Sequence, residues 1–221
     1  MSDGDLIVRG YRPEDRPAVR RICHVTGYMG DPADWYWADE DSFADTWTGY
    51  YTDKEPESCG VVELDGEVVG YLMGCRDTRQ ADPPENIIGR HLIGGRHLLV
   101  RRGTAGFIWR AVGDIAVDAA RRRLPARDTY DPRWPAHLHI DLLPVARGRG
   151  AGRLLMQRWL DRLRADGIAG CHLGTLAENT AGIAFFEAMG FRRHGGTPPV
   201  PGMRSPTGAR HHEQLMVQEL T

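Results

Sequence analysis

A glycine-rich segment between an apolar run and an amphipathic helix constrains this chain more than any other feature. Residues 142–152 read LLPVARGRGAG, and apolar or small residues then recur with the helical period, at Gly152, Leu155, Met156, Trp159, Leu160 and Leu163. A strand that enters a helix through glycines presents unpaired backbone N–H groups and the positive end of the helix dipole. The segment therefore predicts an anion site, most naturally for phosphate or pyrophosphate. Arg147 and Arg149 add positive charge beside it.

Two common phosphate motifs do not fit this segment. A Walker A loop needs a lysine and a hydroxyl residue after its last glycine, and neither follows Gly152. A dinucleotide fingerprint counted from Gly148 needs a third glycine where Arg153 stands, and the acid expected near the end of the next strand is missing. A glycine-rich turn that merely connects a strand to a helix is the remaining plain alternative.

Periodicity along the rest of the chain predicts an α+β fold. Helices are expected near residues 18–25, 39–51, 149–166 and 179–189, and strands at 6–8, 59–64, 67–73, 137–143, 171–176, 191–194 and 213–220. Asp65-Gly66 marks a two-residue hairpin, and a Pro/Gly-rich loop is expected from Gly195 to Gly208. We expect one domain over residues 1–221, with a roughly seven-stranded mixed sheet flanked by helices. Residues 76–135 are an insertion between the third and fourth strands with one helical segment, 104–122.

Composition excludes several classes of protein. The formal charge is -2 over 221 residues, which argues against a general nucleic-acid binder. No apolar run reaches the ~18–20 residues of a membrane span, and the acidic start lacks the apolar region of a signal peptide. The cysteines are Cys23, Cys59, Cys75 and Cys171, without C-x-x-C spacing, which favours reduced thiols and a cytoplasmic location. His211-His212 and the scattered cysteines lack metal-ligand spacing, so we expect no metal.

Charge is divided unevenly along the chain. Residues 1–75 hold 6 basic and 16 acidic side chains, whereas residues 76–221 hold 22 and 14. Residues 31–57 combine acids with aromatic side chains, which suits a cationic amine or an aminosugar. Phe43, Trp47 and Tyr50 share a helical stripe typical of core, whereas residues 35–37 lie outside it and are expected to be freer to contact a ligand. A solvated acidic face is the plain alternative.

The motif R-x-x-G-x-G from Arg147 to Gly152 resembles the acyl-CoA signature of the GNAT acetyltransferase superfamily. A second block, residues 179–191, resembles that family in Asn179, Ile183, Phe186, Gly190 and Phe191. Residues 137–141, HLHID, and 70–78, GYLMGCRDT, are similar to a bacterial branch related to the acetyltransferase-like C-terminal domain of O-GlcNAc hydrolases. The likeness covers most of the chain except about 79–130.

The resemblance implies a fold in which two parallel strands splay apart around the pantetheine arm of acetyl-CoA. The backbone of the strand end would pair with pantetheine amides, N–H groups of the glycine loop would hold the pyrophosphate, and Asn179 would bond the pantetheine arm. The implied cofactor-binding residues are Leu142, Leu143, Pro144, Arg147, Gly148, Arg149, Gly150, Ala151, Gly152, Asn179 and Phe186. Asn179 is also a plain helix N-cap candidate.

Phe186 departs from the family pattern. Relatives commonly carry a tyrosine there that protonates or steadies the departing thiolate, and phenylalanine donates no proton. Water, another side chain such as Tyr11, Tyr28 or Tyr130, or an unaided thiolate could take over that step. The chain is therefore read as an acetyltransferase acting on an unknown amine, or alternatively as a non-catalytic protein that binds acetyl-CoA.

Four residues are candidates for catalysis. His137, His139 and Asp141 alternate along a strand and so share one face, and His is suited to taking a proton near pH 7. The position that commonly carries a base in relatives falls on Ala136 or Leu138, on the opposite face, unless a β-bulge reverses the register. Asp77, at a strand end before the insertion, is the second acidic candidate.

Overall fold

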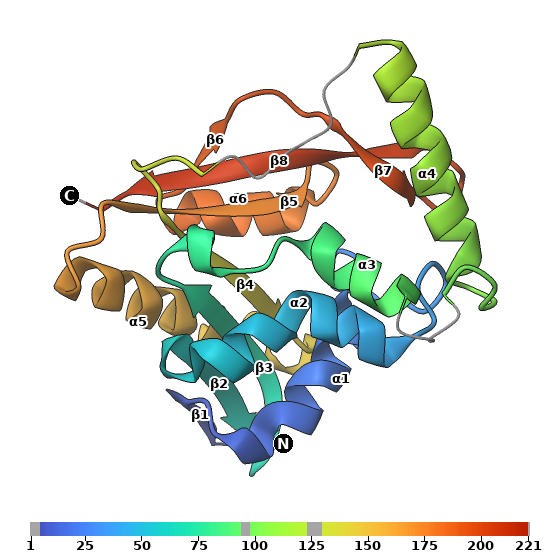
Figure 1. The fold of residues 1–221 in the computed structure, drawn as a ribbon. Coiled ribbons are helices and arrows are strands. Elements are labelled where there is room, and N and C mark those ends of the chain that lie inside the picture. The colour runs from blue at the N-terminus through green and yellow to red at the C-terminus, as the bar shows by residue number, and fades with distance from the viewer. Residues whose placement is uncertain (1–4, 94–97, 123–129, 221) are drawn as a thin grey trace.

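An eight-stranded mixed sheet organises the chain in a computed structural model that describes residues 5–93, 98–122 and 130–220 (Figure 1). The strand order is β1-β2-β3-β4-β5-β8-β6, with β7 paired to β8, and the β4–β5 pair alone is parallel. The strands are β1 Leu6–Gly10, β2 Cys59–Leu64, β3 Glu67–Cys75, β4 Ala136–Leu142, β5 Gly170–Leu176, β6 Arg192–His194, β7 Pro199–Arg204 and β8 Arg210–Glu219. The helices are α1 Arg16–Thr26, α2 Glu40–Lys54, α3 Pro84–Ile93, α4 Ala105–Ala120, α5 Ala151–Ala165 and α6 Thr180–Ala188.

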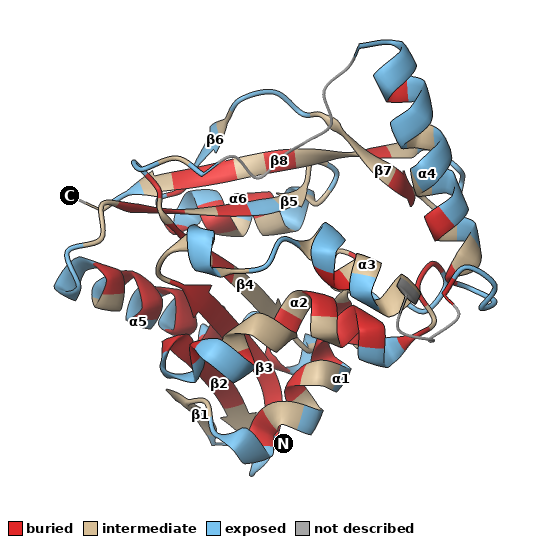
Figure 2. Cartoon of the chain, in the orientation of Figure 1, coloured by how far each residue is buried: buried red, intermediate tan, exposed pale blue. Residues whose placement is uncertain are grey.

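The two faces of the sheet bury separate hydrophobic clusters. Alternate residues of one strand go to opposite faces, as at Tyr71 and Leu72 of β3. Leu72 packs in the cluster formed with α5 and α6, whereas Tyr71 packs in the cluster formed with α1 and α2. The buried stripe of α5 is the one that the sequence predicts, and it includes Leu155, Met156, Trp159, Leu160 and Leu163. Figure 2 shows this burial concentrated on the central strands and on the helix faces toward them.

The predicted hairpin is confirmed. β2 and β3 pair antiparallel across Asp65 and Gly66, whose φ angles are 52° and 87°. Both residues thus occupy the left-handed region that a two-residue turn of this type requires. The mixed sheet, the helix after the glycine loop and the late strands are confirmed too, with bounds shifted by a few residues.

Three expectations are wrong. The segment before α4 holds a second helix, α3, and the Pro/Gly-rich loop contains β7, so the sheet has eight strands. β7 pairs with β8 only through Pro199 and Arg204, around a register shift, which is how prolines are tolerated in an edge strand. Tyr36 and Trp37 are buried in the α1–α2 cluster, while Trp35 is exposed. No helix among the described residues is long and apolar enough to cross a membrane.

Candidate active site

A gap between β4 and β5 lies at the centre of the sheet. Each strand has seven residues, yet their recorded pairing is limited to Ala136 with Cys171 and His137 with His172. Beyond these pairs each strand keeps its other neighbour, β3 or β8, but no ladder joins β4 to β5. Backbone polar groups left without a strand partner need another one. The gap can therefore accept an extended, amide-containing ligand as an added strand would.

Leu142 supplies a backbone donor to this gap. The N–H of Leu143 donates to the carbonyl of Val69 in β3, at 2.8 Å. Because successive N–H groups of a strand point in opposite directions, the N–H of Leu142 points away from β3 and toward β5. Of the strand-end residues, Leu143 has its N–H already paired and Pro144 has none. The donor available at this end of β4 is thus the Leu142 amide.

The glycine loop opens at the same end of β4. Gly148 and Gly150 have φ angles of 71° and 81°, a conformation that favours glycine, and α5 begins at Ala151. Gly150 is the N-cap and has no side chain to satisfy the first N–H groups of the helix. Apart from their neighbours in the chain, no described residue comes within 4 Å of where a Cβ would stand at Gly148 or Gly150. The loop therefore leaves room for an anion directly before a helix N-terminus.

Arg147 connects this loop to the turn between α1 and α2. Its Nε donates to the carbonyl of Leu142 at 3.0 Å, and its Nη2 donates to the carbonyl of Gly30 at 2.7 Å. Met29 and Gly30 both have positive φ, so the turn is tight where the guanidinium holds it. Arg147 thus fixes the α1–α2 turn across the end of β4, in addition to placing positive charge beside the loop.

Asn179 and Phe186 lie on the β5 side of the gap. The Oδ1 of Asn179 accepts from the N–H of Gly182 at 3.0 Å, which confirms the N-cap, and its Nδ2 donates to Thr175 at 3.2 Å. Phe186 is buried against Phe185 and Phe191. The aromatic ring contributes packing here, and it has no hydroxyl to donate.

His139 and Asp141 come together on the α1–α2 face of β4. The Nε2 of His139 lies 2.8 Å from Oδ2 of Asp141, and the hydroxyl of Tyr71 donates to the same oxygen at 2.6 Å. The His139 ring is stacked between Tyr71 and Trp47, with ring centroids 5.8 and 6.2 Å away. Desolvation opposes charge on this ring, but the Asp141 carboxylate outweighs it and raises the pKa of His139 to about 10. The ring therefore carries a proton at neutral pH.

No β-bulge interrupts the pairing of β4 with β3, so the side chains of β4 alternate regularly between the two faces of the sheet. Pairing with β3 runs without a shift from Leu142 to His137. Ala136 and Leu138 lie in the cluster under α5, opposite the face of His139 and Asp141. The reversal considered from the sequence does not occur in this stretch.

His137 and Asp77 lie toward the other end of β4. His137 is four residues from Asp141, about 13 Å along a strand. Its Nδ1 lies 2.8 Å from the Thr78 hydroxyl, and desolvation, with His172 nearby, lowers the pKa of His137 to about 3. Asp77 caps the turn that follows β3 and pairs with Arg79 at 2.7 Å, which lowers its pKa. Catalytic roles for His137 and Asp77 stay predictions. His137 lies two residues from His139 on the same face of β4.

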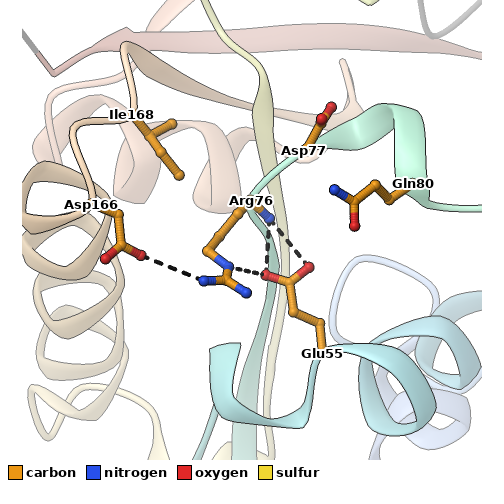
Figure 3. Close-up of a pocket in the computed structure, with 6 residues that line it drawn as sticks. All are labelled: Glu55, Arg76, Asp77, Gln80, Asp166 and Ile168. Atoms are coloured by element: carbon orange, nitrogen blue, oxygen red, sulfur yellow. Dashed lines mark hydrogen bonds and ion pairs between the residues drawn. The ribbon is translucent and has the colours of Figure 1, made fainter.

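Asp77 lines a surface cavity of about 460 Å³ near this end of the sheet (Figure 3). The cavity is crossed by the side chain of Arg76, which bonds Glu55 at 2.8 Å and lies 3.8 Å from Asp166. Its charges are thus largely paired with one another. Several acids of residues 39–57 are also paired with arginines of the protein: Asp39 pairs with Arg101, and Asp53 pairs with Arg16.

Cys23, His139 and Asp141 place a thiol, a ring nitrogen and a carboxylate oxygen within 4.8 Å of one another. This donor set is one that zinc accepts. The His139 and Asp141 atoms are 2.8 Å apart, which is a hydrogen-bond distance and shorter than the roughly 3.4 Å between two ligands of tetrahedral zinc. As arranged here, the cluster is a hydrogen-bonded pair with a buried thiol beside it.

Tyr28, His211 and Glu178 form a second polar chain, which sequence reasoning did not assemble. The hydroxyl of Tyr28 lies 2.8 Å from Nε2 of His211, and Nδ1 of His211 lies 3.2 Å from Oε2 of Glu178. Glu178 directly precedes Asn179. Tyr28 was noted in the sequence as a possible proton donor, but 183 positions separate it from His211, and no spacing rule joins them.

Parallel strands that splay apart, a backbone donor and a glycine loop at one end of β4 form the arrangement that the resemblance to the acetyltransferases implies. The profile of the acetyltransferase (GNAT) family matches residues 28–191, and the chain belongs to this family of N-acetyltransferases. The predicted family is thereby confirmed.

Solved structures share the fold over almost the whole chain. The crystal structure of SsHAT is 26% identical with a TM-score of 0.63, covering 98% of this chain and 99% of that one. YncA of Salmonella typhimurium, a putative acetyltransferase with its cofactor acetyl-CoA, is 19% identical with a TM-score of 0.58, covering 98% and 94%. The Drosophila melanogaster polyamine N-acetyltransferase, which forms N-acetylagmatine, is 17% identical with a TM-score of 0.57, covering 98% and 100%.

Proposed function

We propose that this protein transfers the acetyl group of acetyl-CoA to an amine of a small molecule, an aminosugar or a peptide by direct attack. The observation that carries the proposal is the β4–β5 gap, which opens directly onto the glycine loop. An extended pantetheine arm fits the first and a pyrophosphate fits the second. The gap and the loop are adjacent, so a single acetyl-CoA could place its pantetheine arm in the gap and its pyrophosphate at the loop.

The cofactor would be held mainly by backbone groups. N–H groups from Gly148 to Gly152 would bind the pyrophosphate, because the N–H of Arg147 already donates to the carbonyl of Pro144. Arg149 would add charge, and the backbone of β4 would pair with pantetheine amides. The Leu142 amide is the proposed donor to the thioester carbonyl, whose oxygen gains negative charge in the transition state. Asn179 and Phe186 would line the opposite side of the arm.

Asp141 is the proposed group that receives the acceptor amine. Both of its recorded hydrogen bonds end on Oδ2, which leaves Oδ1 to accept from an ammonium or amine. His139 keeps its proton at neutral pH, so we assign it the role of positioning Asp141 rather than that of the base. The rings of Trp47 and Tyr71 stack on the protonated His139 ring and so favour its positive charge beside Asp141.

Tyr28 is the proposed donor that replaces the tyrosine missing at position 186. Tyr11 follows β1 at the far edge of the sheet, and the guanidinium of Arg79 lies over the ring of Tyr130 near the Asp77 end. Tyr28 instead sits in the turn that Arg147 fastens to the end of β4, and its hydroxyl reaches His211 on the β5–β8 side. Desolvation raises the pKa of Tyr28, so its hydroxyl is protonated at neutral pH.

The chemical step then balances without a further reactant. The neutral amine attacks the carbonyl carbon, the C–S bond breaks, and the new amide loses its extra proton to Asp141 or water. Tyr28 gives its proton to the coenzyme A thiolate, and the phenolate recovers one through His211. The Glu178 carboxylate lies 3.2 Å from Nδ1 of His211 and would stabilise positive charge on that ring during the transfer.

Thermal unfolding with and without acetyl-CoA, followed by thiol release across a panel of amines and aminosugars, tests the proposal. We expect acetyl-CoA to raise the Tm and at least one amine to release coenzyme A. A Tm that does not respond refutes acyl-CoA binding altogether. A clear Tm shift without turnover on any amine favours the second candidate, a non-catalytic acetyl-CoA-binding protein, for which the buried Phe186 is the specific argument.

The finer assignments are part of the same proposal. The HLHID segment of β4 and the 70–78 segment support placement in the bacterial branch related to the C-terminal domain of O-GlcNAc hydrolases. Four buried free cysteines are consistent with a reducing cytoplasm. We propose that the reaction proceeds without a metal, because the polar groups already named cover each proton and charge in the step.

A further inference from the structure

The helix α4 has its polarity reversed relative to an ordinary surface helix. Its three charged residues are Arg110, Asp114 and Asp118; Asp114 and Asp118 bond β7 and β8, and the exposed Arg110 reaches back to a carbonyl of β7. Asp114 accepts from the guanidinium of Arg204 at 2.7 Å and from the N–H of Gly202 at 2.8 Å. Asp118 pairs with Arg210 at 2.6 Å, and Arg110 donates to the Gly202 carbonyl at 3.4 Å. Ion pairs and hydrogen bonds thus fasten α4 to β7 and β8.

The outer face of α4 is apolar. Trp109, Val112, Ile115 and Val117 are exposed by 59%, 51%, 51% and 46%, and the outward positions between them are Gly113 and Ala116. At 100° per residue, these positions occupy the part of the helix circumference that lies opposite and beside the three charged residues. α4 stands at the edge of the molecule (Figure 1), and most of its surface is exposed (Figure 2). A monomeric surface helix shows the opposite arrangement.

The apolar patch extends beyond the helix. The indole N–H of Trp109 donates to the carbonyl of Leu99 at 3.1 Å, and Leu99 and Val100 are themselves exposed. With about 100 Å² for a fully exposed aliphatic side chain and about 200 Å² for tryptophan, the six residues offer roughly 400 Å² of apolar area. At the apolar share of a homodimer interface, that corresponds to about 600 Å² per subunit and about 1,200 Å² in total. This total clears the roughly 1,000 Å² expected of a specific interface.

We propose that this face of α4 binds the same face of a second copy of this chain, with the two helices related by a two-fold axis. A two-fold contact places one patch against itself, and a face without charges meets no like-charge repulsion there. Gly113 and Ala116 lie near the middle of this face and permit close approach of the helices.

Pairing of α4 also supports the wall of the candidate active site. Phe107, on the inner side of the helix, contacts the rings of Tyr36 and Trp37 at centroid distances of 5.6 and 5.5 Å. The Thr104 hydroxyl at the start of α4 accepts from the N–H of Ala38 at 3.1 Å. A partner that fixes α4 therefore fixes the aromatic segment beside the acceptor side.

Sedimentation equilibrium of the full chain between about 1 and 100 µM tests this inference independently of any activity. We expect a dimer whose dissociation constant rises at least tenfold in Val112→Glu. The matched control is Ile7→Glu, which places the same charge on an exposed apolar position of β1 and is expected to leave the dimer intact. Circular dichroism and the Tm of each variant show that the fold is retained.

Ala116→Cys gives a second readout with a conservative change. The native cysteines Cys23, Cys59, Cys75 and Cys171 are all buried, so mild oxidation should produce a covalent dimer through position 116. A monomeric wild-type chain at all concentrations would overturn the inference. So would a dimer that Val112→Glu leaves unchanged, or a monomer that instead sediments with anionic lipid vesicles.

Discussion

Replacing Asp141 by asparagine should remove a pH dependence of stability that His139 causes. The folded chain holds the His139 proton up to a pKa of about 10, whereas an unfolded histidine loses it near 6.5. The stabilisation is therefore complete below pH 6.5 and is lost as pH rises toward 10. Full linkage amounts to about 1.36 kcal/mol per pH unit, or roughly 3 kcal/mol between pH 6.5 and 9. Because the His139 side chain is 31% exposed, we expect about half of that.

The assay is urea unfolding of the reduced protein at pH 6.5 and pH 9. In Asp141→Asn the amide still accepts from Tyr71, but the negative charge is gone and desolvation keeps the His139 ring neutral in the folded state. The fall in unfolding free energy between the two pH values should therefore be smaller than in the wild type by about 1.5 kcal/mol. His139→Gln should behave like Asp141→Asn.

Asp161→Asn is the matched control, because this exposed carboxylate pairs with Arg164 on the surface of α5. It should keep the wild-type pH dependence. If the unfolding free energy falls by the same amount between pH 6.5 and pH 9 in the wild type and in Asp141→Asn, the assignment of a cationic His139 held by Asp141 is refuted.

Three further changes test the loop, the proton donor and the core. Gly150→Val imposes a β-branched side chain on a φ of 81°; we expect a folded chain, destabilised by about 1–2 kcal/mol, whose Tm no longer responds to acetyl-CoA. Tyr28→Phe removes the hydroxyl that meets His211, so kcat for thiol release should fall about 100-fold with little change in KM, and Phe186→Tyr in that background should recover part of it. Leu155→Ala empties part of the cluster under α5 and should lower the unfolding free energy by about 2–5 kcal/mol, measured by urea titration.

The elements with strong local signals were predictable. The stripe of α5, the Asp65-Gly66 turn and the strands on either side of it follow from periodicity and turn chemistry. β7 was missed because prolines and glycines normally end a strand, and here only tertiary pairing to β8 makes one. α3 lies in the part of the chain where the family resemblance is weakest.

The candidate site was predictable where it depends on one continuous segment. The glycine loop can be read from residues 142–152, since backbone conformation does most of the work there. The stacking of His139 between Trp47 and Tyr71 brings three separate elements together, and no sequence pattern connects them. The same is true of Tyr28 and His211. The sequence can identify such side chains one by one as candidates, but it cannot predict which of them come into contact, because the contacts form only in the tertiary fold.

Calorimetric titration of acetyl-CoA into the wild-type protein, beside Gly150→Val, tests the central claim most directly. The β4–β5 gap and the glycine loop together predict one acetyl-CoA bound per chain and no detectable binding to the variant. Salt should weaken the wild-type affinity because the loop binds a charged pyrophosphate. Absence of binding heat in the wild type, or equal affinity in Gly150→Val, would contradict the claim that the β4–β5 gap and the glycine loop hold an acyl-CoA.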